Sequence, residues 1–365
     1  MTETHRADMA EATRLTRAGR LSEATALLQG LLHGGQRPAQ APAPEPAQEP
    51  GTLHKLLDRL KGLGAGLGNG GQARPAPAPG DGSFTSASFT HRAGTRAYKL
   101  DVPSTAGTRP LPLVVMLHGC TQSPDDFAAG TRMNRLAEEQ GCYVAYPEQS
   151  ARANAQRCWN WFQPGDQARD QGEPSLIAGI VREIMAQHRV DPARVYVAGL
   201  SAGGAQAAIM AATYPDLFAA VGVHSGLACG VARDLPSALS AMRAGPNGTA
   251  PATAGPAVPT ILFHGDQDRT VNPANGDRIA AQALGGALLA PEIEEGRSDG
   301  GLAYSRACYA DASGRILLER WTVHGAGHAW SGGSPDGTFT EPRGPDASRE
   351  MLRFFLSHCV PNAPR

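Results

Sequence analysis

The sequence predicts an α/β protein built on a doubly wound, mostly parallel sheet. Two observations lead to this prediction. Between about residues 83 and 365, short β-rich runs alternate with helical runs, and this rhythm is typical of a parallel sheet with helices on both faces. The β-rich runs are also almost continuously apolar, as expected for parallel strands that are buried on both faces.

The expected elements follow one another in the order that this fold requires. Six runs are candidate strands of the sheet: LPLVVML (111–117), CYVAYP (142–147), RVYVAG (194–199), AAVGVHS (219–225), PTILFHG (259–265) and RILLERWTV (315–323). Helical segments lie between them, at about 131–141, 175–189, 202–213, 274–284 and 346–357. Two earlier runs, FTSASFTHR and AYKLDVP, are expected to form antiparallel edge strands.

The first 82 residues are organised differently. Residues 1–33 carry alanine and leucine at helical spacing, interrupted at Gly19, which predicts a helical hairpin resembling one tetratricopeptide-like unit. A single unit cannot bury its own apolar face, so this leader is either a docking element for a partner or a second subunit, or a loosely packed segment without a role. Residues 34–82 are a Pro/Ala-rich linker, with a short amphipathic helix in LHKLLDRLKGLGAGLG. That helix either contacts a granule, a membrane surface or a partner, or serves as a spacer.

The expected domains are therefore a leader at 1–33, a linker at 34–82 and a catalytic domain at 83–365. The net charge of −1 gives no indication of a nucleic-acid or anionic membrane partner. The N-terminus lacks the apolar core of a secretory signal, and no stretch approaches a membrane span, so we expect a cytoplasmic protein. A late mis-annotated start or non-standard export would reverse this expectation.

The six cysteines include no C-x-x-C pair, which disfavours a zinc site or a thioredoxin-like motif. Their even number fits three disulfides, but it also fits six thiols, which are the default in a reducing cytosol.

The segment VYVAGLSAGGAQAAIM carries the strongest indication of chemistry. A strand ends in Gly199-Leu200-Ser201-Ala202-Gly203 and a helix follows at once, which is the G-x-S-x-G motif in the strand–turn–helix setting of an α/β-hydrolase nucleophile. The sharp turn presents the Ser201 hydroxyl at the carboxyl end of the sheet, and side chains larger than hydrogen two positions away would clash. The alternative is an ordinary glycine-rich turn without a catalytic role.

A serine hydroxyl needs a base, and in this fold the partners follow in the order Ser, Asp or Glu, His. The segment HGDQDRTV offers Asp266 and Asp268 after a strand, and we choose Asp268 as the acid while Asp266 is expected to cap or brace the loop. The segment VHGAGHAWSGG offers His324 and His328. We choose His328 as the base because it lies in a glycine-flanked loop that can swing over the serine, whereas His324 is still near the strand end.

Acyl transfer also requires hydrogen-bond donors for the oxyanion. One is the backbone N–H of Ala202, the residue after the nucleophile. The other is expected from the loop after the strand at 111–117, and the N–H of Cys120 is the candidate. His118, two residues earlier, is expected to brace this loop rather than to act as a base. The chemistry requires neither a metal nor an organic cofactor.

These motifs together resemble a known family. In order along the chain, LHGCTQSPDDFA, CWNWF, GLSAGG, FHGDQDRTV and GHAWSGG are similar to the polyhydroxybutyrate (PHB) depolymerase family of esterases, which also includes feruloyl and acetylxylan esterases. The resemblance covers about residues 95–358. It implies an α/β-hydrolase fold and hydrolysis of carboxylic esters by a triad of Ser201, Asp268 and His328.

The resemblance has two further implications. Many relatives are extracellular, where a cysteine at the position of Cys120 can be disulfide-bonded near the oxyanion loop. Here Cys158 is the natural partner, and the alternative is a pair of buried thiols. An extracellular location is accordingly the alternative to the cytoplasm.

Trp159, Trp161 and Trp330 lie near active-site loops and are candidate substrate contacts, although indoles at such positions often simply pack. The insert 229–258 is expected to be a flexible flap or surface loop.

The expected substrate is poly- or oligo-3-hydroxybutyrate or a related short aliphatic ester. Two alternatives remain open. One is a carbohydrate esterase of the feruloyl or acetylxylan type. The other, from a different class, is a granule-binding or scaffold protein that uses residues 1–82 and keeps a silent hydrolase fold.

Overall fold

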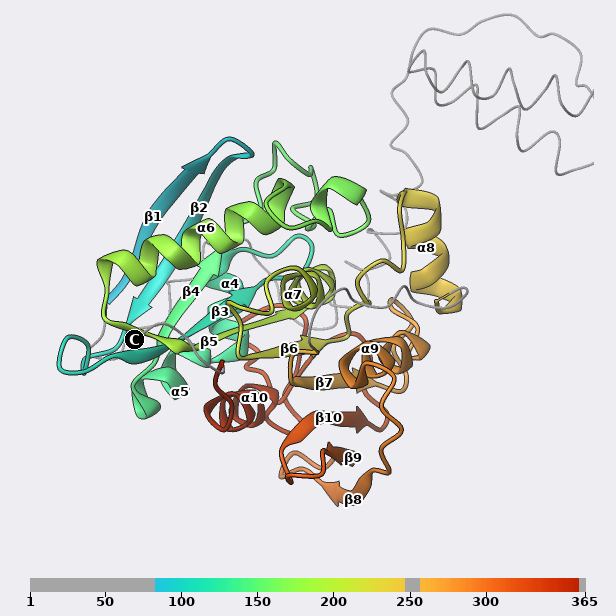
Figure 1. Ribbon diagram of the computed structural model, residues 1–365. Helices are drawn as coiled ribbons and strands as arrows, with labels where there is room; N and C mark the ends of the chain where they lie inside the picture. Colours follow the sequence, from blue (N-terminus) through green and yellow to red (C-terminus); the bar gives the residue numbers. More distant parts are fainter. Residues whose placement is uncertain (1–82, 247–256, 361–365) are drawn as a thin grey trace, which may run out of the picture. The chain divides into compact units, whose positions relative to one another are not determined.

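A computed structural model of the chain describes residues 83–246 and 257–360 (Figure 1). The leader predicted at 1–33 and the linker predicted at 34–82 lie outside these residues, so both remain predictions. Within the described ranges, no helix is both long and apolar enough to cross a membrane.

The described residues form a ten-stranded sheet with the strand order β1-β2-β4-β3-β5-β6-β7-β10-β9-β8. Neighbouring strands from β4 to β10 in this order run parallel, and the strands outside them are antiparallel. The strands are β1 (Ser83–His91), β2 (Gly94–Val102), β3 (Leu111–Leu117), β4 (Tyr143–Pro147), β5 (Val190–Leu200), β6 (Ala220–His224), β7 (Thr260–Gly265), β8 (Glu292–Arg297), β9 (Ala303–Ala310) and β10 (Ile316–Val323). A separate parallel pair is formed by β11 (Trp330–Ser331) and β12 (Thr340–Glu341).

Seven α-helices and one 3₁₀ turn are present in the described residues. They are α4 (Pro124–Thr131), α5 (Met133–Gln140), η1 (Pro164–Asp166), α6 (Gly172–Gln187), α7 (Ala202–Thr213), α8 (Leu235–Ala244), α9 (Ala274–Leu284) and α10 (Ala347–Leu356). Together with the sheet they make the doubly wound α/β arrangement that the sequence predicts.

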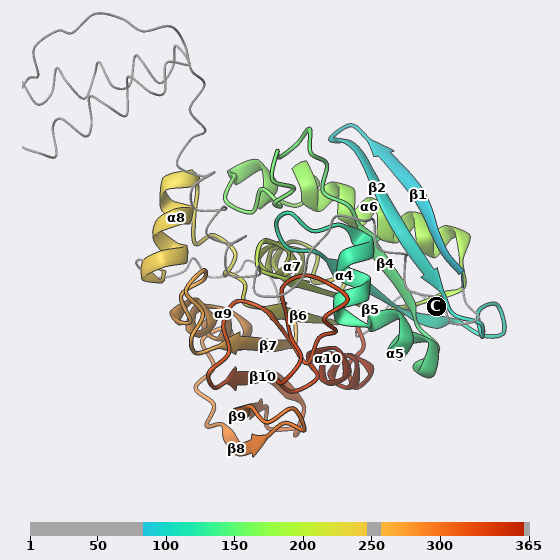
Figure 2. The same ribbon diagram turned by 180° about the vertical axis from the view of Figure 1, so that it is seen from behind.

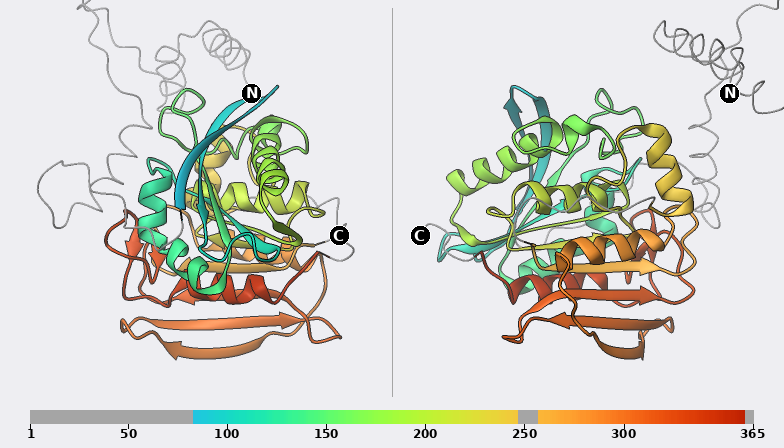
Figure 3. Two further views of the ribbon diagram at one scale, coloured as in Figure 1. Left: turned by 90° about the vertical axis from the view of Figure 1, so that its left-hand side faces the viewer. Right: turned by 45° about the vertical axis from the view of Figure 1, so that its right-hand side comes forward.

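Two hydrophobic clusters, one on each face of the sheet, explain the continuous apolar runs. Along β3, Leu113, Val115 and Leu117 join the cluster that contains α6, α7 and α9, whereas Val114 and Met116 join the cluster that contains α4, α5 and α10. Figures 1, 2 and 3 show these helices on the two sides of the sheet. Each β3 residue is buried, because side chains alternate between two covered faces.

The six predicted strands of the parallel core are all present, with ends within one residue of the prediction except at β5, which begins four residues earlier. The two early runs are antiparallel strands as expected, but only β1 lies at the edge, because β2 also pairs with β4. The strands β8 and β9 were not predicted. β8 reads EIEEGR and is almost wholly exposed, so it carries no apolar run that marks a strand.

The prediction of a flap or surface loop at 229–258 was wrong for part of the insert, because α8 lies within it. Asp234 caps this helix. Its carboxylate accepts the Ser237 N–H at 2.8 Å, and the Ser237 hydroxyl oxygen accepts the Asp234 N–H. Residues 247–256 lie outside the described ranges.

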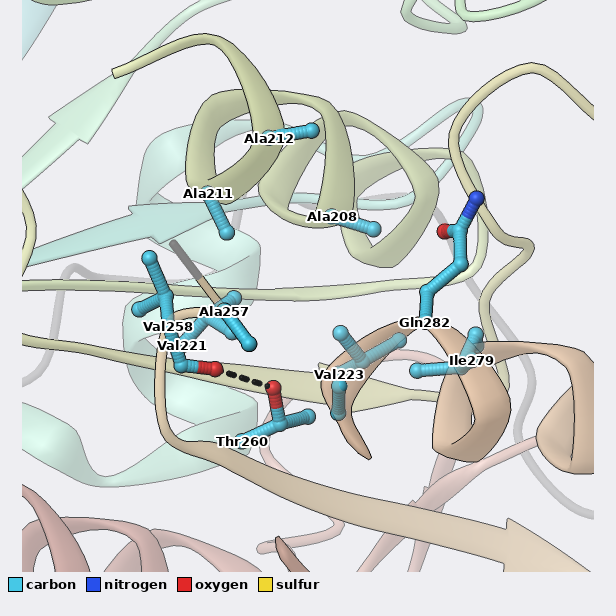
Figure 4. A pocket seen from close by; sticks show the side chains of 11 residues that line it. Ala208, Ala211, Ala212, Val221, Val223, Ala257, Val258, Thr260, Ile279 and Gln282 are labelled. Atoms are coloured by element: carbon cyan, nitrogen blue, oxygen red, sulfur yellow. Dashed lines mark hydrogen bonds between the residues drawn. The ribbon is translucent and has the colours of Figure 1, made fainter. Parts of the chain in front are cut away.

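An apolar pocket lies between α7 and α9, over β6 and the start of β7 (Figure 4). Ala208, Val223 and Ile279 contribute to its lining. Its polar groups are already bonded, since the Thr260 hydroxyl donates to the Val258 carbonyl at 2.9 Å and the Gln282 amide to the Cys229 carbonyl at 2.8 Å. The residues that line this pocket include no titratable side chain.

Candidate active site

Ser201 lies between the last residue of β5 and the first residue of α7. Its backbone has a φ of 57° and a ψ of −119°, a strained conformation for a residue with a side chain. The flanking glycines make the turn possible. A Cβ at Gly203 would lie 2.0 Å from the Leu117 carbonyl oxygen, and one at Gly199 would lie 2.3 Å from the Gly203 backbone. The turn is therefore packed directly against the end of β3, with no room for larger residues.

Asp268 and His328 form a close pair at the same edge of the sheet as Ser201. The Oδ2 atom of Asp268 lies 2.7 Å from Nδ1 of His328, and the other carboxylate oxygen accepts the N–H groups of Thr270 and Val271 at 2.8 and 2.9 Å. Because a carboxylate only accepts hydrogen bonds, Nδ1 of His328 carries the proton and Nε2 is free to take one. This is the arrangement that a general base requires.

A second imidazole also faces the acid. Nε2 of His264 lies 3.4 Å from Oδ2 of Asp268 and 2.9 Å from the Val271 carbonyl oxygen. Both neighbours are acceptors, so Nε2 of His264 carries the proton. Burial alone would raise the pKa of Asp268, but His328 and the hydrogen bonds from both histidines lower it well below its ordinary value. The carboxylate therefore stays ionised although only 5% of the residue is exposed.

The strand order brings the three candidate triad residues to one edge. The strands β5, β6, β7 and β10 lie side by side in the sheet in this order, and they run parallel. Ser201 follows β5, Asp268 follows β7 and His328 follows β10. All three therefore emerge at the carboxyl ends of the strands, where open α/β sheets bind their ligands.

The two residues that the sequence analysis set aside form a pair of their own. Oδ2 of Asp266 lies 3.0 Å from Nδ1 of His324, and Oδ1 accepts the Gly325 N–H at 2.8 Å. These contacts tie the loop after β7 to the loop after β10. Asp266 thus braces the loop that carries Asp268, as expected, and the structural role of His324 stays a prediction.

This pair extends to a serine, which produces a second Ser-His-Asp array. The Ser305 hydroxyl oxygen lies 2.7 Å from Nε2 of His324. However, the same hydroxyl donates to the Glu295 carboxylate at 2.7 Å, and Ser305 lies within the strand β9 rather than at a strand-to-helix turn. A neighbouring carboxylate would repel a developing oxyanion, so the geometry favours Ser201 as the nucleophile.

The oxyanion loop follows β3 and is held by several hydrogen bonds. Nε2 of His118 accepts the Gln149 N–H at 3.1 Å, so Nδ1 carries the proton and donates to the Gly119 carbonyl at 2.7 Å. Burial lowers the pKa of His118 to about 4, and the neutral ring therefore acts as the expected brace. Within the ranges that the structure covers, the N–H groups of Cys120 and Ala202 have no hydrogen-bond acceptor. Both candidate donors are thus available.

The disulfide between Cys120 and Cys158 is present, which confirms that prediction. It joins the oxyanion loop to the loop that carries Trp159, and the Thr121 N–H donates to the Gln156 carbonyl at 2.7 Å beside it. The other four cysteines, Cys142, Cys229, Cys308 and Cys359, are free.

Reducing this disulfide should lower kcat more than it raises KM, because the donor that it holds acts mainly on the transition state. The sequence separation of 38 residues corresponds to about 4 kcal/mol of stabilisation in the chain-entropy treatment. The double replacement Cys120→Ser with Cys158→Ser should have the same effect, and Cys359→Ser serves as the control at an exposed free thiol. Thiol counting in denaturant verifies reduction. Unchanged kcat in fully reduced, folded protein would show that packing alone holds the loop.

The tryptophans require a correction. Trp159 and Trp330 are 0% and 1% exposed, and their indole N–H groups donate to the His118 carbonyl at 3.1 Å and the Ser348 hydroxyl at 3.0 Å. They were predicted to contact substrate, but both rings are packed in the protein core and leave no face for a ligand. Trp161 is 5% exposed and packs edge-on against Phe162, and its substrate contact remains a prediction.

Two histidines near this site were not singled out by the sequence analysis. His264 is next to Gly265 in the motif FHGDQDRTV, and His224 is the last residue of β6. A histidine at the end of an apolar strand is the available signal for each. Among the residues described, no group of His, Cys, Asp and Glu is arranged to hold a metal ion.

Comparison with known proteins identifies the family of this chain. Residues 96–290, more than half of the chain, match the sequence model of the family described as Esterase PHB depolymerase. This chain belongs to that family. The matched stretch includes Ser201 and Asp268 and ends before His328. The family resemblance and the α/β-hydrolase fold that the sequence predicts are therefore confirmed.

Individual relatives come from more than one class of esterase. The chain is 37% identical over 230 residues to poly(3-hydroxyalkanoate) depolymerase C of Paucimonas lemoignei, covering 60% of this chain but about half of that protein, 54%. It is 29% identical over 277 residues to feruloyl esterase B of Neurospora crassa, covering 70% of this chain and 85% of that protein. Among solved structures, an acetyl xylan esterase from Aspergillus awamori shares the fold. The TM-score is 0.60 at 21% identity, and the match covers 75% of this chain and 99% of that chain.

Proposed function

We propose that this PHB depolymerase family member is a serine carboxylic ester hydrolase that works through an acyl-enzyme. The supporting observation is the combination of a strained Ser201 at a strand-to-helix turn with a hydrogen-bonded pair of His328 and the buried Asp268 at the same sheet edge. In the proposed reaction, Ser201 Oγ attacks the ester carbonyl and Nε2 of His328 takes its proton. Asp268 keeps the base in the tautomer that can accept it.

The remaining steps use groups that are already oriented. The N–H groups of Cys120 and Ala202 hold the oxyanion, and loss of one such donor typically costs about 10²–10³ in rate. His328 then returns the proton to the departing alkoxide. In the second half-reaction, His328 activates a water molecule that releases the acyl group from Ser201.

The proposed substrate is poly- or oligo-3-hydroxybutyrate or a related short aliphatic ester. The similarity to a poly(3-hydroxyalkanoate) depolymerase, at 37% identity, supports this choice. A feruloyl or acetylxylan ester is the second candidate, supported by the relative named feruloyl esterase B, of which the match covers 85%. If hydroxybutyrate polymer is the substrate, we propose that residues 1–82 contact the polymer or its granule.

A disulfide is typical of oxidising compartments, which favours an extracellular location over the cytoplasm.

A substrate panel tests this proposal. It comprises p-nitrophenyl esters of increasing acyl length, hydroxybutyrate oligomers, native and crystalline polymer, methyl ferulate and acetylated xylan. We expect hydrolysis of short acyl esters and hydroxybutyrate oligomers, and no hydrolysis by the Ser201→Ala variant. Activity on the ferulate or xylan esters alone would select the second candidate. A folded wild-type protein that hydrolyses none of them, yet binds polymer granules, would support a scaffold with a silent hydrolase fold.

A further inference from the structure

His224 connects the two halves of the candidate catalytic machinery. It is the last residue of β6 and is 1% exposed. Its backbone carbonyl accepts the N–H of Ser201 at 2.9 Å, and its ring Nε2 accepts the N–H of Ser331 at 2.9 Å. Ser331 is three residues after His328. One residue therefore binds the backbone of the nucleophile and the loop of the base.

The hydrogen bonds of His224 define its tautomer. A backbone N–H can only donate, so Nε2 of His224 is unprotonated and Nδ1 carries the proton. Nδ1 lies 3.2 Å from the Ser225 hydroxyl oxygen, which accepts from it. Burial lowers the pKa of His224 to about 3, and the neighbouring imidazoles of His264 and His328 act in the same direction. The ring is therefore neutral at working pH and keeps the lone pair that Ser331 uses.

Aromatic packing also fixes the His224 ring. It stacks on Phe263 of β7, with ring centroids 5.7 Å apart, and on Trp330, with centroids 5.1 Å apart. In the sheet register, His224 is opposite Leu200 on one side and Phe263 on the other. Trp330 and Ser331 belong to the loop that carries His328, so two consecutive residues of this loop contact the same imidazole.

We propose that His224 is a positioning residue that sets the distance between the Ser201 hydroxyl and the His328 imidazole. This inference rests on the proposed esterase function. The alternative for a buried histidine is packing alone, but packing does not explain the hydrogen bond from Ser331 to the ring, which joins the base loop to the strand whose backbone binds Ser201. A misplacement of about 1 Å between reacting groups can cost about 10²-fold in rate, so a rigid link between them has a large effect on kcat.

The variants His224→Phe and His224→Gln separate positioning from packing. Phenylalanine keeps the ring stack and the backbone carbonyl but loses the acceptor for Ser331, and we expect kcat to fall by about 10²-fold with little change in KM. Glutamine can place a carbonyl oxygen near the position of Nε2, and it should recover most of this loss.

His358→Phe is the matched control. His358 is also buried, packs at a tilt against the Phe354 ring and bonds to the backbone carbonyls of Phe354 and Ile316. Ile316 is at the start of β10, so these contacts lie at the opposite end of the strands. This variant should lose thermal stability while keeping kcat.

The low-field proton resonance of the His328–Asp268 hydrogen bond gives a readout besides activity. It should shift or broaden in His224→Phe, return in His224→Gln and stay unchanged in His358→Phe. Wild-type kcat and an unchanged resonance in folded His224→Phe would overturn the proposal, as would equal losses of kcat in His224→Phe and His358→Phe. If the wild-type protein hydrolyses no ester, the proposed function fails, while the resonance still tests the positioning role.

Discussion

Replacing Ser201 with alanine should lower kcat by about 10⁴–10⁶-fold and leave the fold intact. The members of a triad act as a unit, so removing the nucleophile abolishes the covalent route. Alanine occupies the turn without new contacts, since it is smaller than serine. The variant is measured against a p-nitrophenyl ester, with circular dichroism and thermal melting to verify folding.

Ser305→Ala is the matched control for this prediction, because Ser305 also has a histidine and an aspartate behind it. It should keep wild-type activity. A fluorophosphonate should label Ser201 alone in the wild-type protein. Labelling of Ser305, or an active Ser201→Ala variant, would assign the nucleophile to the other array.

Replacing Asp268 with asparagine should lower kcat by about 10⁴-fold while His328 and Ser201 stay in place. The physical reason is the tautomer of the base. Asp268 now accepts the proton on Nδ1 of His328 at 2.7 Å, whereas an amide can present an N–H there and favour a proton on Nε2. A base protonated on Nε2 cannot take the proton of Ser201.

Asp266→Asn is the control, since it makes the same chemical change two residues away. Asp266 holds His324 and the Gly325 N–H, so its replacement should lower the melting temperature and spare kcat. The comparison needs kcat and the melting temperature for both variants. If Asp266→Asn loses catalysis and Asp268→Asn loses only stability, the acid has been assigned to the wrong aspartate.

Much of the fold follows from local patterns. The near-continuous apolar runs at β3 to β7 identify buried parallel strands, because both faces of such strands are covered. The strand–turn–helix setting of Ser201 is also local, since Gly199 and Gly203 are close in sequence. Where apolar periodicity is weak, as at the exposed strand β8, local patterns gave no prediction.

The pairing of each aspartate with its histidine needed both the sequence and the tertiary structure. The sequence selects Asp268 and His328 by their position after strands, and the structure places this pair 2.7 Å apart and the rejected pair of Asp266 and His324 3.0 Å apart. Their catalytic roles remain predictions that the variants above test.

By itself, then, the sequence determined the α/β-hydrolase class, the family and the turn at Ser201, because each is encoded over a few consecutive residues or in the order of motifs. Only the tertiary structure decided that Trp330 packs on His224 instead of facing substrate, and that His264 contacts Asp268. These contacts depend on the order of strands in the sheet, which brings β6, β7 and the loop after β10 together. Hydrophobic periodicity reports whether a strand is buried, but not which strand lies beside it.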